Sequence, residues 1–434
     1  MRNRRILSIL IILALWLMPF NAFALDYIDT FSSLADSFSG FVDKNAGTTV
    51  FPSLNIPSGG REESLASAFT AIADDISFFE YNPAASCVLK QTALGFFHNS
   101  WIADSNIETI SATIRKDNLG LGVKLKCFYV PFTEYDDFGF RMASSYYSET
   151  TAIVNASYIF FNGYYFKGLA VGANLKTAWR SIPDYTDRET GQIIKNSGLA
   201  QSGAAFMTDL GLLLRFNAAK NFDDRDPNLK FGLAIQNLGV SLTGFGTAQG
   251  IRLDDALPTA ISAGLSYRFI KPVMIAVDFK QPVNLMDFSQ TQMYSFGAAI
   301  DVNVTDFVEV MAGFRLQGAN PRISLGTEIE LNKFILDMNY TFDLTSSLNP
   351  VNHFSLALKI NFGDRGRYQR ELEAEVYYED GLKFYAQGRL DEAVESWKKC
   401  LEINPSFTPA RNNIKLVQSS KRLFDRVIDI QSLE

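Results

Sequence analysis

Residues 334–363 read FILDMNYTFDLTSSLNPVNHFSLALKINFG, and this stretch decides the fold class. Its last segment places an apolar residue at every second position from Phe354 to Phe362, with Ser355, Lys359 and Asn361 among the residues between them. The segment that begins at Phe334 alternates in the same way. Because successive side chains of a strand point to opposite faces, both segments are predicted to be β-strands with one apolar and one polar face.

The same alternation recurs throughout residues 86–363 in runs of 10–14 residues. Soluble strands usually have about 5–6 residues, whereas a tilted transmembrane strand needs about 9–11. Only a closed barrel pairs every backbone group within a bilayer, so the pattern predicts an antiparallel transmembrane β-barrel. The alternative is a large soluble β-sandwich, whose buried face would also alternate. The fourteen expected strands lie near 91–103, 106–117, 119–132, 149–162, 164–182, 205–220, 227–245, 256–271, 273–284, 292–304, 307–318, 321–333, 334–347 and 349–363.

Composition divides the chain and excludes several classes of protein. The 434 residues include 40 Lys and Arg against 47 Asp and Glu, a net charge of −7 that argues against a general nucleic-acid binder. Three cysteines are too few for a disulfide scaffold and two histidines are too few for a His-rich zinc site, so we expect no metal and no cofactor. Charged residues number 48 among the 278 of 86–363 and 25 among the 71 of 364–434. The tail is therefore predicted to be a separate, water-exposed module.

The N-terminus has the pattern of an export signal. Basic residues Arg2, Arg4 and Arg5 precede an apolar run at 6–18, and Ala22-Phe23-Ala24 supplies small residues around a cleavage site after Ala24. The alternative is a membrane anchor, but the run is short for a span of about 20 residues. Together with the predicted barrel, a signal peptide places the mature chain in the outer membrane.

The connections between the expected strands differ at the two ends of the barrel. Those that follow odd-numbered strands include the long polar segments 133–148 and 183–204, whereas most of the others are short. Outer-membrane barrels have short periplasmic turns and longer external loops. An even number of strands then places both barrel termini, and with them the tail, in the periplasm.

Residues 60–90, GREESLASAFTAIADDISFFEYNPAASCVLK, precede the first strand and contain the motif Asn82-Pro83-Ala84. Apolar residues at helical spacing over 64–79 predict a short helix here. This segment resembles the N-terminal hatch of FadL-type outer-membrane transporters, and with the tail the whole arrangement is similar to an uncharacterised spirochaetal family of FadL-like proteins. Ala85 stands where many FadL-type proteins have Gly. The alternatives are that Asn-Pro starts an ordinary turn and that the helix caps the barrel from the periplasm.

The resemblance implies a fourteen-stranded barrel that carries long-chain fatty acids or other hydrophobic compounds past a hatch within its lumen. A carboxylate on such a compound needs a cation near an apolar groove. No motif aligns the family's ligand residues with this chain, so the candidates are cations on the polar faces of the strands. They are Arg115, Lys124, Lys126, Lys176, Arg180, Arg215, Arg268 and Lys359. The alternative is that they pair with lumenal carboxylates such as Asp209, Asp278, Asp301 and Glu328.

Residues 374–407 match one tetratricopeptide repeat, a pair of antiparallel helices, with a third helix expected at 409–424. The residues that carry the match are Tyr377, Gly381, Phe384, Ala393, Trp397 and Pro405. A single repeat cannot bury a continuous core, so this module is expected to dock on the barrel rim, on another copy or on a periplasmic protein.

The predicted organisation is a mainly β protein: a signal peptide (1–24), an N-terminal segment and hatch (25–90), a fourteen-stranded transmembrane barrel (91–363) and a periplasmic helical tail (364–434). The predicted function is passive uptake of long-chain fatty acids or other hydrophobic compounds across the outer membrane. The alternative is a barrel that anchors or shuttles surface or secreted proteins while its tail recruits periplasmic partners. No nucleophile and histidine form a recognisable motif, so we do not expect an enzyme.

Overall fold

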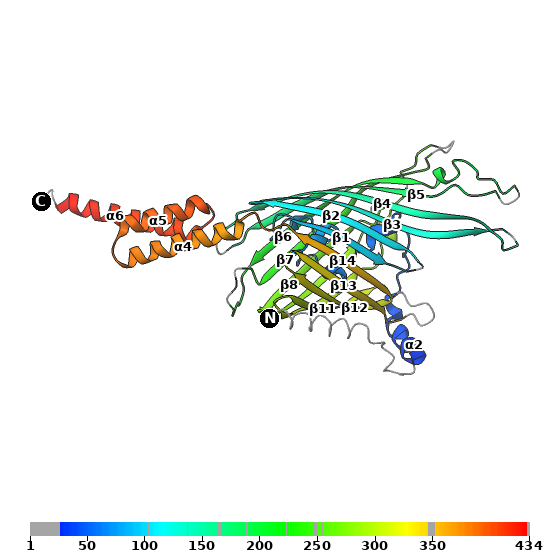
Figure 1. Ribbon diagram of the computed structural model, residues 1–434, viewed down its shortest axis with the longest axis horizontal. Coiled ribbons are helices and arrows are strands. Elements are labelled where there is room, and N and C mark those ends of the chain that lie inside the picture. Colours follow the sequence, from blue (N-terminus) through cyan, green and yellow to red (C-terminus); the bar gives the residue numbers. More distant parts are fainter. Residues whose placement is uncertain are drawn as a thin grey trace.

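The computed structural model describes residues 27–102, 104–136, 138–163, 166–187, 190–222, 224, 226–245, 250–253, 255–345 and 352–431. The predicted signal peptide lies outside these residues. A barrel and three C-terminal helices make up most of the structure (Figure 1).

Fourteen antiparallel strands form a closed barrel, as the alternating pattern predicts. Each strand pairs with its neighbours in sequence, and β1 closes the ring against β14 from Ala93↔Asn361 to Ser100↔Phe354. None of the described helices is both long and apolar enough to cross a membrane. The strands are β1 (Ala93–Ser100), β2 (Asn106–Lys116), β3 (Leu119–Tyr135), β4 (Arg141–Phe160), β5 (Leu169–Ser181), β6 (Gly203–Phe216), β7 (Leu229–Thr243), β8 (Ala260–Ile270), β9 (Val273–Pro282), β10 (Ser295–Thr305), β11 (Val308–Gln317), β12 (Asn320–Leu331), β13 (Phe334–Asp343) and β14 (His353–Asn361).

The barrel is apolar outside and polar inside. On β3 the outward side chains of Leu121 and Val123 are 45% and 53% exposed, whereas Lys124 and Lys126 point inward and are 4% and 2% exposed. A soluble protein buries its apolar side chains and exposes its lysines. The reversed pattern is typical of a barrel of the outer-membrane type.

The two ends of the barrel differ. The turn end carries the connections after the even-numbered strands, such as Asp117–Asn118 between β2 and β3, and the tail that follows β14. The loop end carries the connections after the odd-numbered strands. The prediction of a loop at 133–148 is wrong. Instead, β3 and β4 continue as a paired hairpin beyond the barrel, with Thr133 opposite Ser144 (Figure 1). Strands that pair in water need no apolar face. This segment therefore lacks the alternating apolar residues from which the other strands were predicted.

Residues 43–58, the strap, cross the loop end of the barrel. Val50 N–H donates to the carbonyl of Ala256 at 2.9 Å, and the Asn45 amide donates to the carbonyl of Thr291 at 2.8 Å. Phe51 is fully buried against Ala178 and Met207 of the barrel wall. Before the strap lie α2 (Tyr27–Phe38) and η1 (Ser39–Phe41), and η2 (Pro52–Asn55) lies within it.

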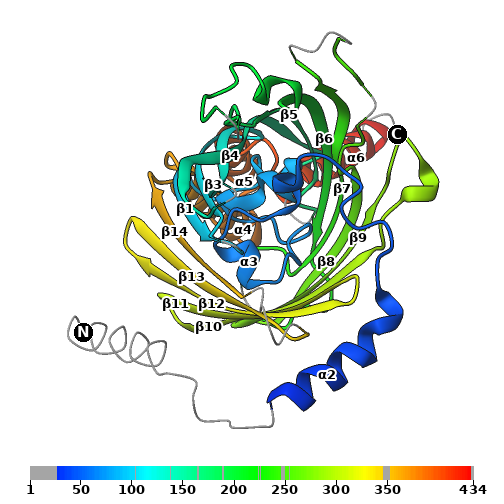
Figure 2. The same cartoon turned by 90° about the vertical axis from the view of Figure 1, so that its right-hand side faces the viewer.

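The hatch, residues 60–90, continues from the strap into the barrel (Figure 2). Its short elements are α3 (Arg61–Ser64), η3 (Ile76–Glu80) and η4 (Pro83–Ala85). The prediction of a helix over 64–79 is wrong. Ala66, Ser67 and Ala73 have positive φ angles of 49°, 66° and 37°, which a right-handed helix does not allow. The N–H groups of Phe69 and Thr70 donate to the carboxylate of Asp278 on β9, so the wall of the barrel replaces helical hydrogen bonds.

The tail consists of α4 (Arg367–Ala386), α5 (Leu390–Ile403) and α6 (Thr408–Gln431). Its core contains Ala374, Ala393, Trp397 and Cys400, each at most 1% exposed. Trp397 lies against Gly381, where a Cβ atom would come within 2.3 Å of the indole nitrogen. Only a residue without a side chain lets the first two helices approach this closely.

Candidate functional site

The hatch backbone lies directly against glycines of the barrel wall. A Cβ atom on Gly172 would lie 2.2 Å from the carbonyl oxygen of Pro83, and one on Gly211 would lie 2.3 Å from Oδ1 of Asn82. Such distances exclude any side chain at these two positions. The glycines on the inward faces of β5 and β6 therefore form the seat of the hatch.

Asn82 holds the end of the hatch in this seat. Its side-chain amide donates to the carbonyl oxygens of Thr70 in the hatch and Leu212 on β6, at 2.8 and 3.1 Å. Its Oδ1 accepts from the N–H of Ala84 at 3.1 Å, which starts η4. The carbonyl of Pro83 accepts from Asn155 on β4 at 2.9 Å. The motif residues Asn82, Pro83 and Ala84 are all buried and tie three strands to the hatch.

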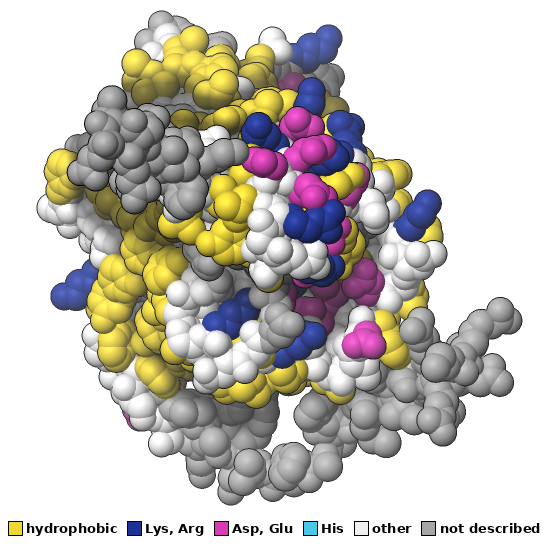
Figure 3. Space-filling model, turned by 90° about the vertical axis from the view of Figure 1, so that its left-hand side faces the viewer, with side chains coloured by type: hydrophobic (Ala, Val, Ile, Leu, Met, Phe, Trp, Pro, Cys, Tyr) yellow, Lys and Arg dark blue, Asp and Glu magenta, His cyan; other side chains and the backbone are white. Residues whose placement is uncertain are grey.

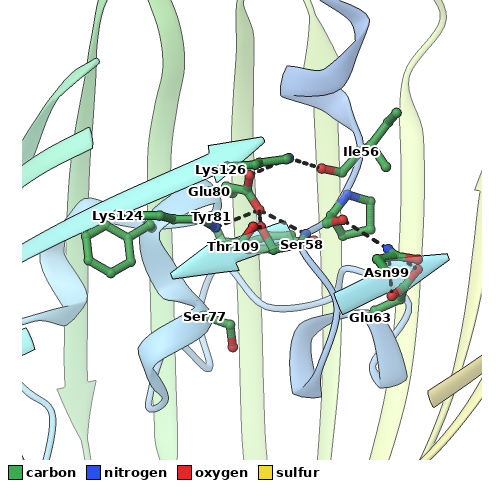
Figure 4. Close-up of polar contacts among 12 residues, drawn as sticks. Ile56, Ser58, Glu63, Ser77, Glu80, Tyr81, Asn99, Thr109, Lys124 and Lys126 are labelled. Carbon is green, nitrogen blue, oxygen red and sulfur yellow. Dashed lines mark hydrogen bonds and ion pairs between the residues drawn. The ribbon is translucent and has the colours of Figure 1, made fainter. Parts of the chain in front are cut away.

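Glu80 anchors the middle of the hatch to β3 and to the strap (Figure 4). Its carboxylate lies 3.1 Å from Nζ of Lys124 and 2.7 Å from Nζ of Lys126, and it accepts from the hydroxyl of Ser58 at 3.0 Å. Burial alone would raise the pKa of Glu80, but the two lysines hold this pKa well below its usual range. Lys126 also donates to the carbonyl of Ser53 at 2.9 Å.

Two further candidate cations are neutralised inside the barrel. Lys176 lies 2.7 Å from Asp209, and Lys359 lies 2.9 Å from Glu328 and 2.7 Å from Asp337. Asp75 of the hatch also contacts the Lys359 ammonium. Asp75, Glu328 and Asp337 have the spacing of a cation site, but the lysine already occupies its centre. For Lys124, Lys126, Lys176 and Lys359 the structure thus places carboxylates where a ligand head group would bind.

The remaining four candidates form no ion pair with a described carboxylate. Arg115, Arg215 and Arg268 donate to backbone carbonyls, and the guanidinium of Arg180 lies 5.5 Å from the ring centre of Phe51. These arginines do not share one site. Arg180 is near the loop end beneath the strap, whereas the other three are near the turn end.

A pocket opens between the strap, the hatch and the inward faces of β7–β11. Its cavity volume is about 40 Å³, which is room for a few water molecules or a small head group. Apolar atoms of the strap line one side, from Leu54, Ile56 and Pro57. Lys280 on β9 and Arg315 on β11 also line the pocket.

The two cations of the pocket have no carboxylate partner among the described residues. Arg315 donates to the hydroxyl of Ser67 at 3.2 Å and to the side-chain amide of Gln317 at 2.5 Å, and Lys280 has no hydrogen bond or ion pair within the described part of the chain. The two carboxylates that also line the pocket are engaged elsewhere, Glu80 by lysines and Asp278 by hatch N–H groups. An uncompensated positive charge thus faces an apolar wall.

A like charge also lies opposite Arg315, because β11 and β12 pair Arg315 with Arg322. On its other side Arg322 faces Asp343 of β13, and this carboxylate offsets part of the repulsion between the two arginines. Lys280 and Arg315 were not among the predicted site residues, although their places on the polar faces of their strands are visible in the alternation. Only the three-dimensional structure shows which inward cations lack a carboxylate.

The tail residues that match the repeat lie where the repeat requires them. Trp397 donates from its indole nitrogen to the carbonyl of Tyr378 at 3.2 Å, and Tyr377 and Phe384 pack against the same core. Burial raises the pKa of the Cys400 thiol to about 11, so this cysteine is a packing residue. Pro405 lies in the connection between α5 and α6.

Comparison with known proteins identifies the family of this chain. A model of an uncharacterised protein family, UPF0164, matches residues 28–365, and a tetratricopeptide repeat model matches residues 374–407. The chain belongs to the UPF0164 family. One UPF0164 protein of Treponema pallidum (strain Nichols) is 30% identical over 405 residues, which cover 91% of this chain and 89% of that protein. A second from the same organism is 28% identical over 385 residues, covering 86% and 76%.

Solved structures that resemble this chain include hydrocarbon channels and a FadL homologue. The monoaromatic hydrocarbon channel CymD has a TM-score of 0.45 and 14% identity, over 70% of this chain and 97% of that one. The Pseudomonas putida toluene transporter TodX has a TM-score of 0.42 and 13% identity, over 67% and 94%. A Pseudomonas aeruginosa FadL homologue has a TM-score of 0.42 and 10% identity, over 70% and 98%.

Proposed function

We propose that this UPF0164 protein is an outer-membrane channel for the passive uptake of long-chain fatty acids or similar hydrophobic compounds with an acidic head group. The observation that carries the proposal is the pocket beneath the strap. Lys280 and Arg315 supply positive charge without a carboxylate partner among the described residues, and Leu54, Ile56 and Pro57 supply an apolar wall. The carboxylate head group of an amphiphile matches the charge of this small pocket, and its apolar chain matches the strap.

The hatch accounts for selectivity in this proposal. A fourteen-stranded barrel is wide enough to leave a lumen unless protein fills it. The hatch fills it with apolar side chains such as Phe69, Phe78 and Phe79, all fully buried, and anchors them through polar contacts to the wall. Water and ions are excluded, and an apolar substrate passes when contacts between hatch and wall rearrange. The proposal places the turn end and the tail in the periplasm, where the tail recruits a partner protein.

The test is uptake of radiolabelled oleate by liposomes that contain the purified full chain. We expect protein-dependent uptake, and a loss of at least about a hundredfold in the double variant Lys280→Gln/Arg315→Gln, because the two charge-assisted hydrogen bonds contribute about 1.5–3 kcal/mol each. The matched control, Lys271→Gln/Lys333→Gln, removes the same charge from exposed turns and should transport normally. Equal uptake by both variants would contradict the pocket as the entry site.

A second candidate function is the anchoring or shuttling of surface proteins. The hairpin of β3 and β4 projects beyond the barrel, and Phe138 and Phe140 at its tip are 87% and 72% exposed. Exposed aromatic side chains at a tip suit a protein contact. Replacing both by Ser should leave oleate uptake unchanged if the chain is a channel, and should reduce the display of a surface partner if it is an anchor.

A further inference from the structure

Three arginines from distant parts of the chain meet where the hatch ends at the turn end. Arg115 lies on β2, Arg215 on β6 and Arg367 in the first turn of α4. The guanidiniums of Arg115 and Arg367 donate to the same atom, the carbonyl oxygen of Leu89, at 3.1 and 3.2 Å. Arg367 also donates to the carbonyl of Lys90. One carbonyl of the hatch thus brings a barrel arginine and a tail arginine together.

Arg215 completes this group, which we call the turn-end arginines. Its guanidinium donates to the carbonyl of Lys167 at 2.9 Å, while its buried Nε atom has no partner among the described residues. Cys87, two residues before Leu89, lies within electrostatic reach of both Arg115 and Arg215. All three arginines are half-buried, so their free N–H groups remain accessible from the turn end.

The turn-end arginines differ from most other buried cations of the barrel in their partners. Lys124, Lys126, Lys176 and Lys359 each bond a carboxylate, whereas every hydrogen bond from the turn-end arginines to a described residue goes to a backbone carbonyl. A carbonyl supplies a partner for an N–H group but leaves the positive charge uncompensated. Three such charges repel one another at close range.

Most carboxylates around the site are engaged elsewhere. Asp226 pairs with Lys90, Asp117 lies 3.7 Å from Arg370, and Asp364 accepts the N–H groups of Gly366 and Tyr368. Glu371 on α4 faces the arginines and is exposed, without an ion pair to any described residue. Figure 3 shows the face of the molecule at the tail end, where basic side chains (dark blue) and acidic side chains (magenta) lie side by side. Asp364, whose partners are neutral N–H groups, and Glu371 carry two negative charges, so the three guanidiniums keep a net positive charge.

We propose that Arg115, Arg215 and Arg367 form an oxyanion site, which takes a carboxylate or a phosphate at the end of the hatch. The guanidinium fork matches both groups and binds them through paired hydrogen bonds. If the proposed function is correct, the carboxylate of the transported compound reaches this site as it leaves the lumen. Since Arg367 belongs to α4, the site is complete only when the tail is in place against the barrel.

The experiment is equilibrium dialysis of radiolabelled octanoate against the full chain in nonionic detergent, with protein-free micelles as the blank. The Lys280→Gln/Arg315→Gln background removes the loop-end pocket, so the remaining binding reports the turn end. We expect one octanoate per chain in this background, and at least about tenfold weaker binding when Arg115→Gln, Arg215→Gln and Arg367→Gln are added. Arg370→Gln, which removes a neighbouring exposed charge, is the matched control and should bind as the background does.

Two competitors distinguish the sources of the anion. Octanol lacks the charge and should not displace octanoate. Displacement by inorganic phosphate at similar concentration would support a site for free phosphate, and displacement only by fatty carboxylates would support a site for the transported compound. Absence of saturable binding, or equal loss in Arg370→Gln, would overturn the proposal. Binding that persists in a chain without oleate uptake would leave this site intact and contradict only the proposed function.

Discussion

Oδ1 of Asn82 in the hatch lies 2.3 Å from the position that a Cβ atom would take on Gly211 of β6. The hatch and the barrel wall are therefore so close at this point that no methyl group fits between them. This contact makes the seating of the hatch testable by a single substitution.

Gly211→Ala should displace the hatch while the barrel stays assembled. Overpacking at such a contact lowers the stability by about 1–3 kcal/mol. Because side-chain contacts hold the hatch, whereas backbone hydrogen bonds hold the strands, we expect the hatch to move and the strands to stay paired. We expect higher ion conductance in planar bilayers and faster proteolysis within 60–90. Gly40→Ala is the control, because a Cβ atom there meets nothing within 4 Å. An unchanged conductance would show that the lumen is closed by something other than the hatch.

Glu80→Gln should unseat the hatch more strongly. The substitution leaves Lys124 and Lys126 buried without their carboxylate, and breaking a buried ion pair from one side costs about 3–5 kcal/mol. We expect a larger rise in conductance than for Gly211→Ala, with heat-modifiable gel mobility retained. Glu330→Gln, at an exposed position of β12, should behave as the unmodified chain. Equal conductance of the two Glu variants would contradict the anchoring role of Glu80.

The seating of the hatch should also depend on pH through Glu80. Its pKa in the seated hatch is well below the usual value of a free Glu, about 4.3. A lowered pKa contributes stability that is present above about pH 4.3 and is lost as the pH falls towards the lowered value. Conductance should therefore stay low between pH 7 and 5 and rise below about pH 4. If Glu80→Gln shows the same rise on acidification, the pH dependence belongs to another group.

Trp397→Ala should unfold the tail and spare the barrel. Removing a buried aromatic residue costs about 3–5 kcal/mol, and the small core around Trp397 has little stability to lose. We expect 370–434 to become sensitive to protease while 86–363 keeps its β-sheet circular dichroism and gel mobility. Tyr368→Ala, at an exposed position of α4, is the control. Loss of both parts together would refute the two-module organisation.

Alternation along 86–363 in runs of 10–14 residues predicted a closed antiparallel barrel, because strands of this length with one apolar face are typical of transmembrane barrels. The matching aromatic and small residues of 374–407 likewise predicted the helical pair, since its contacts are local. Errors arose where backbone groups have distant partners. The hatch was expected to be a helix at 64–79, but Asp278, more than two hundred residues away, accepts its N–H groups.

For the candidate site, too, the sequence predicted local properties but not contacts between distant residues. The sequence placed Lys124, Lys126, Lys176 and Lys359 on polar strand faces, which is a local property. Whether a carboxylate neutralises each cation depends on pairs such as Lys126 with Glu80 and Lys359 with Asp75, and folding brings these together from separate segments. The tertiary structure alone decided that Lys280 and Arg315 remain uncompensated within the described residues, because charge balance in a lumen depends on proximity and not on order along the chain.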